Sequence, residues 1–429
     1  MYNTLKNEYI SIINDILSEW YYMIKIGIPY IEKGEVYSKL NCDVIIGEKE
    51  NKIWLEVDKI YNDYLCTERC DAYVIGVLNY AMRNHMDITS EIPITGELLY
   101  NINRYLIPSL AKHDKSLYAT KITAPIADSV ISNFGAVGTG FSGGVDSLHA
   151  VLTNTNNEFK SLNVTHLLIN NSGAFVDNKE MKLHRYKVAE DFAQEMGLAL
   201  IKTESNFEDA VPQSHFYTHT YSSMFVVYCL QKLWNVYYYG SSGEDFSEFS
   251  VINSTKASST AYELLSLNCF SNSKMRIYSE GGALTRFEKT NEIVDFPIAQ
   301  KYLHTCLREK TNCSKCIKCM RTIMTLDVLG KLNLFSDVYD IDYYKKHKHK
   351  FYLYLYKAHL QKDSMIEPVF FALKKNIPIF IKLFALISII AARIFTITNA
   401  LNRAGEDCKS ITILGFNFMF KKRPKIRTK

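Results

Sequence analysis

Short apolar runs alternate with longer amphipathic stretches between residues 131 and 280. The apolar runs have the length of strands and occupy residues 135–140, 164–170, 198–203, 235–239 and 275–279. Stretches with helical spacing of apolar residues lie between them, at residues 148–152, 177–197 and 219–234. This alternation predicts an α/β domain built on a parallel sheet. The carboxyl ends of parallel strands share one edge, so the polar residues that follow the strands are expected to line one crevice.

Residues 1–130 predict a smaller α/β accessory domain, and they contain no catalytic motif. Two strands at residues 43–47 and 52–57 flank a short turn. Helical spacing then runs over residues 71–86, with Asp71 as the expected N-cap. We expect this domain to act as a scaffold that packs on the parallel sheet.

A glycine turn follows the first strand of the predicted parallel sheet, in the run Phe141-Ser142-Gly143-Gly144-Val145-Asp146-Ser147. A strand, a glycine turn and a helix in succession aim backbone N–H groups at an anion. The two glycines let the backbone approach phosphate oxygens, and the two serines add hydroxyl donors. Asp146 is an acceptor among these donors, so we expect it to hold Mg²⁺ or to cap the helix. The run is not a Walker A loop, because no Gly-Lys-Ser/Thr follows it.

This turn resembles the signature of the PP-loop ATP pyrophosphatases, Ser-Gly-Gly-x-Asp-Ser. The fixed positions of that signature are matched by Ser142, Gly143, Gly144, Asp146 and Ser147. The resemblance implies a HUP-like parallel-sheet domain that binds ATP. It also implies that the β- and γ-phosphates leave as pyrophosphate while AMP is transferred. The alternative is a serine and glycine turn without a ligand.

Two further segments resemble the same family. The loop at residues 240–244 stands where the family has small residues facing the nucleotide, which implies a binding role for Gly240 and Ser241. Asn170 ends the second strand and is expected to face the same crevice. The segment at residues 284–294 resembles the Lys-x-x-(Glu)-Ile-Val helix start of the family. There, Lys289 and Arg286 can neutralise the α-phosphate or the departing pyrophosphate, although surface cations near helix starts are common.

Four cysteines form a C-x6-C-x2-C-x2-C cluster: Cys306, Cys313, Cys316 and Cys319. Four thiolates within 14 residues can hold one tetrahedral Zn²⁺, and an iron–sulfur cluster is the alternative. The cluster looks like the zinc site of 7-cyano-7-deazaguanine synthase, which favours zinc. Among the other cysteines, Cys229 lies in an apolar helix and is expected in the core. Cys269 precedes the fifth strand, where it either packs in the core or reaches the crevice as a persulfide carrier.

Charge is distributed unevenly along the 429 residues. The chain carries a net charge of +5, but residues 343–429 hold 18 Lys and Arg against 4 Asp and Glu, a balance of +14. This excess predicts an anionic contact: a membrane surface, a nucleic acid or an acidic partner. Residues 377–400 are very apolar, yet their longest uncharged run has ten residues and is too short to span a bilayer. They are expected to form a helix that lies in a membrane interface or packs on the body.

The whole chain is therefore expected to contain three parts. These are an α/β accessory domain at 1–130, a PP-loop domain with the cysteine site at 131–325, and a basic helical extension at 326–429. The apolar fraction of 47% and charged fraction of 22% exclude a disordered chain. Ten cysteines without an export-signal pattern predict a reducing compartment, with thiols or metal ligands in place of disulfides. We therefore expect a cytoplasmic location, with membrane association through the extension as an option.

The predicted function is that of an AMP-forming ligase. ATP would activate a carboxylate or carbonyl oxygen of a small molecule or a modified macromolecule, for C–N bond formation. A thiolating enzyme shares this first half-reaction and remains the alternative. A third hypothesis names a different class of protein: a nucleotide-binding scaffold subunit that docks on a membrane, nucleic acid or protein. A homodimer is open in each case.

Overall fold

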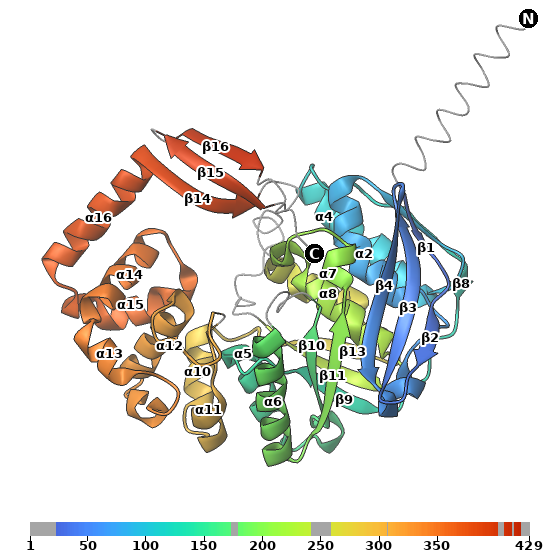
Figure 1. Ribbon diagram of the computed structural model, residues 1–429, viewed down its shortest axis with the longest axis horizontal. Coiled ribbons are helices and arrows are strands. Elements are labelled where there is room, and N and C mark those ends of the chain that lie inside the picture. Colours follow the sequence, from blue (N-terminus) through green and yellow to red (C-terminus); the bar gives the residue numbers. More distant parts are fainter. Residues whose placement is uncertain are drawn as a thin grey trace, which may run out of the picture.

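A single large sheet runs through the centre of the protein. The computed structural model describes residues 23–172, 179–241, 259–306, 308–401, 407–413 and 416–421. Within these residues the sheet has eleven strands, in the order β13-β12-β9-β10-β11-β4-β3-β1-β5-β7, with β2 paired to β3 (Figure 1). The strands are β1 (Met23–Ile26), β2 (Tyr30–Lys33), β3 (Tyr37–Ile46), β4 (Lys49–Asp58), β5 (Asp87–Ser90), β7 (Ile122–Thr123), β9 (Ala136–Gly140), β10 (His166–Asn171), β11 (Ala199–Ser205), β12 (Trp234–Gly240) and β13 (Arg276–Glu280).

The strands β13-β12-β9-β10-β11 are all parallel to one another, which confirms the predicted parallel sheet. The first of them in the chain, β9, lies between the second, β10, and the fourth, β12. The strand order therefore reverses at β9, as in doubly wound α/β sheets. At such a point the two neighbouring crossovers leave on opposite faces, and a crevice opens beyond the carboxyl ends of the strands.

Helices cover both faces of the parallel strands. One face packs on α5 (Val145–Thr153) and α6 (Lys179–Met196), and the other packs on α2 (Asp71–Asn84), α8 (His215–Cys229) and α9 (Glu263–Phe270). Alternation along β10 fits this division. Leu167 and Ile169 join the core under α5 and α6, whereas Leu168 joins the opposite core.

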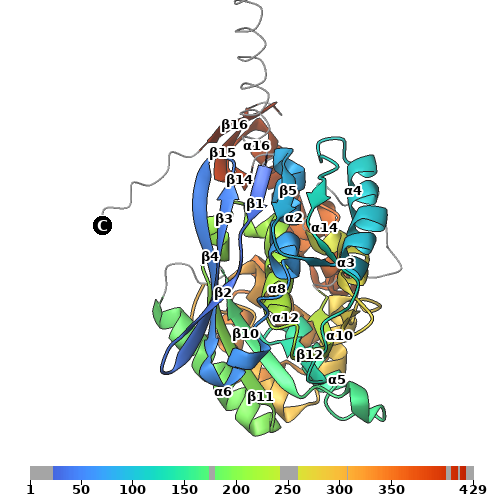
Figure 2. The ribbon, with the colours of Figure 1, turned by 90° about the vertical axis from the view of Figure 1, so that its right-hand side faces the viewer.

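The N-terminal strands extend the same sheet rather than forming a separate one. The predicted turn joins β3 to β4, and β4 pairs antiparallel with β11. Figure 2 shows these strands beside β10 and β11. The prediction that Asp71 caps α2 is wrong, because Cys70 is the N-cap residue. The buried Asp71 carboxylate instead accepts hydrogen bonds from the backbone N–H of Thr95 (2.8 Å) and from its hydroxyl (2.6 Å).

Further helices join the core on the α5 and α6 face: α12 (Ile317–Val328), α13 (Ile341–Lys346), α14 (Lys348–Leu360) and α15 (Glu367–Leu373). Helix α16 (Ile379–Ile394) follows them and packs on α14. Phe351, Leu355 and Val369 from these helices share a core with Leu148 of α5. No helix in the described part of the chain is long and apolar enough to cross a membrane.

The prediction of a helical extension is wrong beyond Ile394. The chain there forms an antiparallel sheet of β14 (Phe395–Leu401), β15 (Asp407–Ile413) and β16 (Phe416–Lys421) (Figure 1). Consecutive β-branched residues in β14, and phenylalanines at every second position of β16, favour strands over a helix. Most of the predicted basic tail, from residue 422, lies outside the described residues.

Gly138 in the centre of β9 is expected to tolerate no side chain. A Cβ there would lie 2.4 Å from Cζ3 of Trp234, whose ring is fully buried and cannot move aside. Gly138→Ala should therefore lower the free energy of unfolding by about 1–3 kcal/mol in urea denaturation. On the same strand, a Cβ on Gly140 would meet its nearest atom, the Tyr237 hydroxyl, at 3.5 Å. Gly140→Ala is the matched control, and equal stabilities of the two variants would contradict the packing described.

Candidate functional site

The predicted anion loop forms a compact turn between β9 and α5. The backbone N–H of Ser142 donates to Ser147 Oγ (3.2 Å), and this hydroxyl donates to the carbonyl of Gly144 (3.1 Å). Gly143 has a φ of +73°, a left-handed conformation that favours glycine. The two serine hydroxyls lie 3.1 Å apart. The sequence therefore predicted the strand, the turn and the helix start correctly.

The N-terminus of α5 is open to the crevice. Its N-cap residue is Gly144, and no side chain in the described structure caps the helix. The first N–H groups of a helix have no partner within the helix and carry partial positive charge. Gly240, at the end of β12, lets this turn approach the sheet, because a Cβ there would lie 3.0 Å from the carbonyl oxygen of Asp146.

Two cations from α10 (Arg286–Ile293) converge on Asp146. Arg286 Nη2 lies 2.7 Å from Asp146 Oδ2, and Lys289 Nζ lies 3.7 Å from Oδ1. Lys289 also donates to the carbonyl of Ser241 at 2.8 Å. A capping box of Thr285 with Glu288 starts α10 and fixes both cations in its first turn. Cations oppose the dipole at a helix N-terminus, so this arrangement requires nearby negative charge.

The side chain of Lys289 is completely buried, and its closest charged partner is Asp146. Burial lowers the pKa of Lys289. The negative charge of Asp146 acts to raise this pKa, and the positive charge of Arg286 lowers it further. Lys318 and Arg321 of α12 also interact electrostatically with Asp146 and Arg286. Four cations therefore act on Asp146, with Glu263 also acting on Lys289 and Asp363 on Arg321, so cationic side chains outnumber acidic ones beside the loop. A bound anion with several charges would balance this surplus.

Glu263 of α9 is a buried carboxyl in the same cluster that the sequence did not reveal. It accepts a hydrogen bond from the Ser279 hydroxyl at 2.6 Å. Burial raises the pKa of Glu263 to about 7, although the hydroxyls of Ser241 and Ser279 and the positive charge of Lys289 each act to lower it. It therefore carries only part of a negative charge at neutral pH. Its only sequence signal is a lone acidic residue in an apolar helix, which is a weak one.

A cavity of about 350 Å³ lies beside the loop, at the point where the strand order reverses. The predicted residues that line it are Ser142, Asp146, Ser147, Asn170 and Gly240. Asn170 is fixed by a hydrogen bond to the Ser172 hydroxyl (3.0 Å) and by one from the Thr203 hydroxyl (3.0 Å). Ser241 lies fully buried next to the cavity. The rest of the predicted small-residue loop, residues 242–244, is outside the described structure.

The opposite wall of the cavity carries two histidines that the sequence analysis missed. His215 and His219 lie one turn apart on α8, and both line the cavity. His215 Nδ1 pairs with Glu208 Oε1 at 2.5 Å. Burial lowers the pKa of His219 to about 4, with a contribution from His215, so His219 is neutral at pH 7. The spacing of four residues on a helix is the signal that could have identified the pair.

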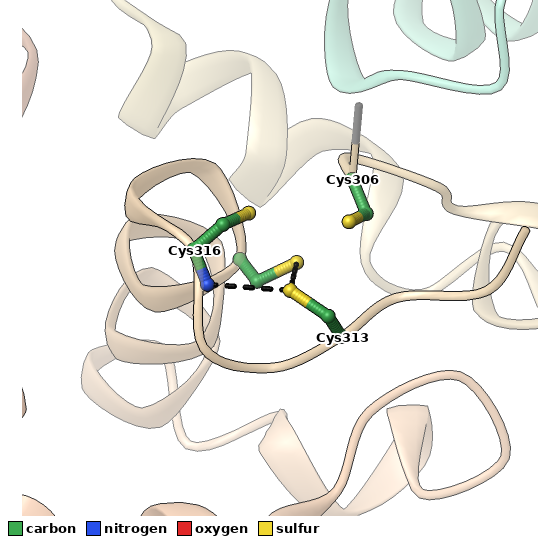
Figure 3. Close-up of side chains that lie close together, drawn as sticks. Cys306, Cys313 and Cys316 are labelled. Atoms are coloured by element: carbon green, nitrogen blue, oxygen red, sulfur yellow. Dashed lines mark hydrogen bonds between the residues drawn. The ribbon is translucent and has the colours of Figure 1, made fainter. Parts of the chain in front are cut away.

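The four predicted cysteines come together in space, and Figure 3 shows the labelled ones pointing toward one another. All four Sγ atoms lie within 4.8 Å of one another, with 4.0 Å between Cys313 and Cys319. A tetrahedral Zn²⁺ with Zn–S bonds of about 2.3 Å needs sulfur atoms about 3.8 Å apart. Cys306 and Cys319 are fully buried. The donor set therefore fits a closed, structural Zn²⁺ site.

Backbone hydrogen bonds reach two of the four sulfur atoms, whereas burial raises the pKa of the Cys316 and Cys319 thiols. The backbone N–H of Cys316 donates to Cys313 Sγ (3.3 Å), and that of Arg308 donates to Cys306 Sγ (3.4 Å). Burial opposes ionisation of Cys306, but the surrounding N–H groups prevail and lower its pKa to about 7. Thiolates are the form that binds a metal.

The cysteine cluster and the anion loop are mechanically connected. Two residues before Cys306, the backbone N–H of His304 donates to the Gly143 carbonyl at 2.7 Å. Cys316 is the N-cap residue of α12, the helix that carries Lys318. A metal held by the cysteines would therefore fix both the glycine turn and part of its cationic surroundings.

In comparisons with known proteins, no family model, no curated protein and no solved structure matches this chain. The family resemblance of the loop and of the cysteine cluster is therefore untested. What the site does has to be inferred from its own residues.

Zinc content tests the cysteine cluster. Purified protein is expected to hold about one Zn²⁺ per chain by elemental analysis, and Cys319→Ser should lose it because three thiolates bind zinc far more weakly than four. Cys269→Ser is the control, since Cys269 is also buried but lies outside the cluster. Iron with visible absorbance, or equal zinc in both variants, would contradict a zinc centre.

The buried Glu263 is expected to make stability depend on pH. Its folded-state pKa of about 7 exceeds the ordinary 4.5, so the folded protein is more stable with Glu263 protonated than with Glu263 ionised. This contribution is fully present below pH 4.5 and is lost as the pH rises through about 7. The loss is about 3 kcal/mol. Urea denaturation between pH 5 and pH 8 should show this fall in the wild type and in the surface control Glu50→Gln. A fall of the same size in Glu263→Gln would exclude Glu263 as its cause.

Proposed function

We propose that this protein is an ATP-dependent, AMP-forming ligase with a PP-loop, HUP-like domain. The observation that carries the proposal is the surplus of cations around Asp146 beside a glycine turn, at the point where the strand order reverses. The phosphates of a nucleotide would accept hydrogen bonds from the open helix N–H groups and be attracted by the buried cations. The glycines, which have no Cβ atom, would let the phosphates approach the backbone. The loop residues that would hold them are Ser142, Gly143, Gly144 and Ser147.

ATP enters this proposal as a substrate, together with Mg²⁺. Asp146 Oδ1 accepts no hydrogen bond within the described residues, so it offers an oxygen ligand to Mg²⁺. When bound, the ion would offset the negative charge of the phosphates. Asn170 and the walls of the cavity would hold the rest of the nucleotide and the acceptor.

The proposed chemistry has two steps. A carboxylate oxygen of the acceptor attacks the α-phosphorus, the bond to the β-phosphate breaks, and pyrophosphate leaves. Arg286 and Lys289 stabilise the charge that develops on this leaving group. An amine or ammonia then attacks the acyl carbon, AMP leaves, and the nitrogen loses a proton. His215, oriented by Glu208 on the opposite wall, is the candidate to accept that proton.

We favour C–N bond formation over sulfur transfer, because the described thiols lie away from the cavity. No cysteine of the described chain lines the cavity. Cys269 was the candidate persulfide carrier, but it is 2% exposed and packs in the core on the α8 side. The four clustered cysteines are directed at one another, which suits a structural metal better than sulfur delivery.

Product analysis tests the proposed reaction. The protein with Mg²⁺-ATP and a metabolite extract should form AMP and pyrophosphate, so the acceptor need not be known in advance. Lys289→Met should lower this rate about 10²–10³-fold, because it removes a positive charge from the leaving group. Lys331→Met, which loses a surface ion pair with Asp295, is the matched control and should behave as wild type.

Two outcomes would contradict the reaction. Formation of ADP and phosphate would place the attack at the γ-phosphate rather than the α-phosphate. Tight binding of Mg²⁺-ATP without turnover, unchanged by Asp146→Asn, would favour a nucleotide-binding scaffold.

A further inference from the structure

An extensive apolar surface lies on α16, at the edge of the molecule (Figures 1 and 2). Only a narrow stripe of the helix packs inward: Ile381 is 4% exposed and Ala385 is fully buried, one turn apart, against the α14 side. Seven large side chains of the helix are open to solvent at 41–70% exposure, and Ile389 is half-buried. The seven exposed side chains are Ile379, Phe380, Leu383, Phe384, Leu386, Ile387 and Ile390.

The sheet that follows α16 carries a second apolar surface, on β16. Phe416, Phe418 and Phe420 occupy alternate positions of β16 and are 50–71% exposed. Residues at alternate positions of a strand share one face. Ile413, which pairs with Phe416 on the neighbouring strand, is 45% exposed on that face. A soluble surface rarely gathers so many exposed aromatic and aliphatic side chains, so the surface is expected to have a partner.

Cations flank the apolar residues. Lys374 and Lys375 are exposed just before α16, and Lys409 is exposed on β15. At about 100° per residue, the half-buried Lys382 lies beside the open apolar face of α16. Residues 374–421 hold seven Lys and Arg against two Asp and Glu, a balance of +5. The segment that carries the apolar surface is therefore basic.

We propose that α16 and β16 dock this protein on an anionic lipid bilayer, with α16 lying in the plane of the interface. An apolar face flanked by cations matches the acyl boundary and the anionic headgroups of such a membrane. With 16 residues, α16 is about 24 Å long, shorter than the hydrocarbon core of about 30 Å, so it lies on the membrane and does not span it.

A second copy of the chain fits the same surface less well. In a symmetric dimer each partner contributes the same patch, so the basic segments would face each other. Like charges in contact disfavour that arrangement, whereas anionic headgroups favour docking.

Vesicle flotation with the full chain tests the proposal. The protein should float with vesicles of phosphatidylcholine containing about one-third phosphatidylserine, and much less with phosphatidylcholine alone. Lys374→Glu with Lys375→Glu should lower the bound fraction about tenfold. The triple variant Phe380→Ser, Phe384→Ser and Ile387→Ser should lower it at least as much, because it removes apolar contacts with the acyl region.

The matched control changes three apolar residues that are equally exposed elsewhere. Ile60→Ser, Ile126→Ser and Phe159→Ser alter side chains that are 78%, 61% and 62% exposed. This variant should float as wild type does. All variants should keep their melting temperature and zinc content, because the altered side chains face solvent.

Three results would overturn the proposal. The first is a wild-type protein that stays unbound with anionic vesicles. The second is equal flotation of the apolar triple variant and its control. The third is a lipid-independent dimer that the apolar triple variant dissociates, which would assign the surface to a second copy of the chain.

Discussion

The buried ion cluster of Asp146, Arg286 and Lys289 is the interaction on which the candidate site depends. Removing a lysine ammonium from water costs several kcal/mol unless partners surround it. Lys289 meets this cost with the Ser241 carbonyl at 2.8 Å and the Asp146 carboxylate at 3.7 Å. Lys289 lies on α10, while its two partners lie just after β12 and on α5. The cluster is therefore stable only when all three are correctly docked, and its geometry reports the geometry of the loop.

The cysteine cluster is connected to this arrangement through the backbone of His304 and through helix α12. The segment that carries Cys306 also holds the Gly143 carbonyl through the backbone of His304. Helix α12 starts at Cys316 and brings Lys318 and Arg321 toward the loop. A metal at this position would replace the large apolar core that such a short, irregular segment lacks. The cysteine cluster and the glycine turn are thus structurally coupled.

The rest of the chain shields the parallel sheet. On one side β4 pairs with β11, so the N-terminal strands cover an edge that would otherwise expose unpaired backbone groups. On the α5 and α6 face, α12 to α15 add a second layer of helices. Helix α16 is packed only along a narrow stripe, which leaves its apolar face free for the lipid contact proposed above.

The sequence by itself determined the features that depend on neighbouring residues. Strand periodicity, the glycine turn and the cysteine spacing are local, and they located the five parallel strands, the loop and the four clustered cysteines. Local patterns failed where long-range contacts compete: Asp71 bonds to Thr95 instead of capping its helix, and the apolar run beyond Ile394 pairs as a strand. Tertiary structure alone brought Glu263, His215 and His219 to the site. Their elements are separated from the loop in sequence, and only the tertiary fold places the two histidines at the cavity and Glu263 beside Lys289.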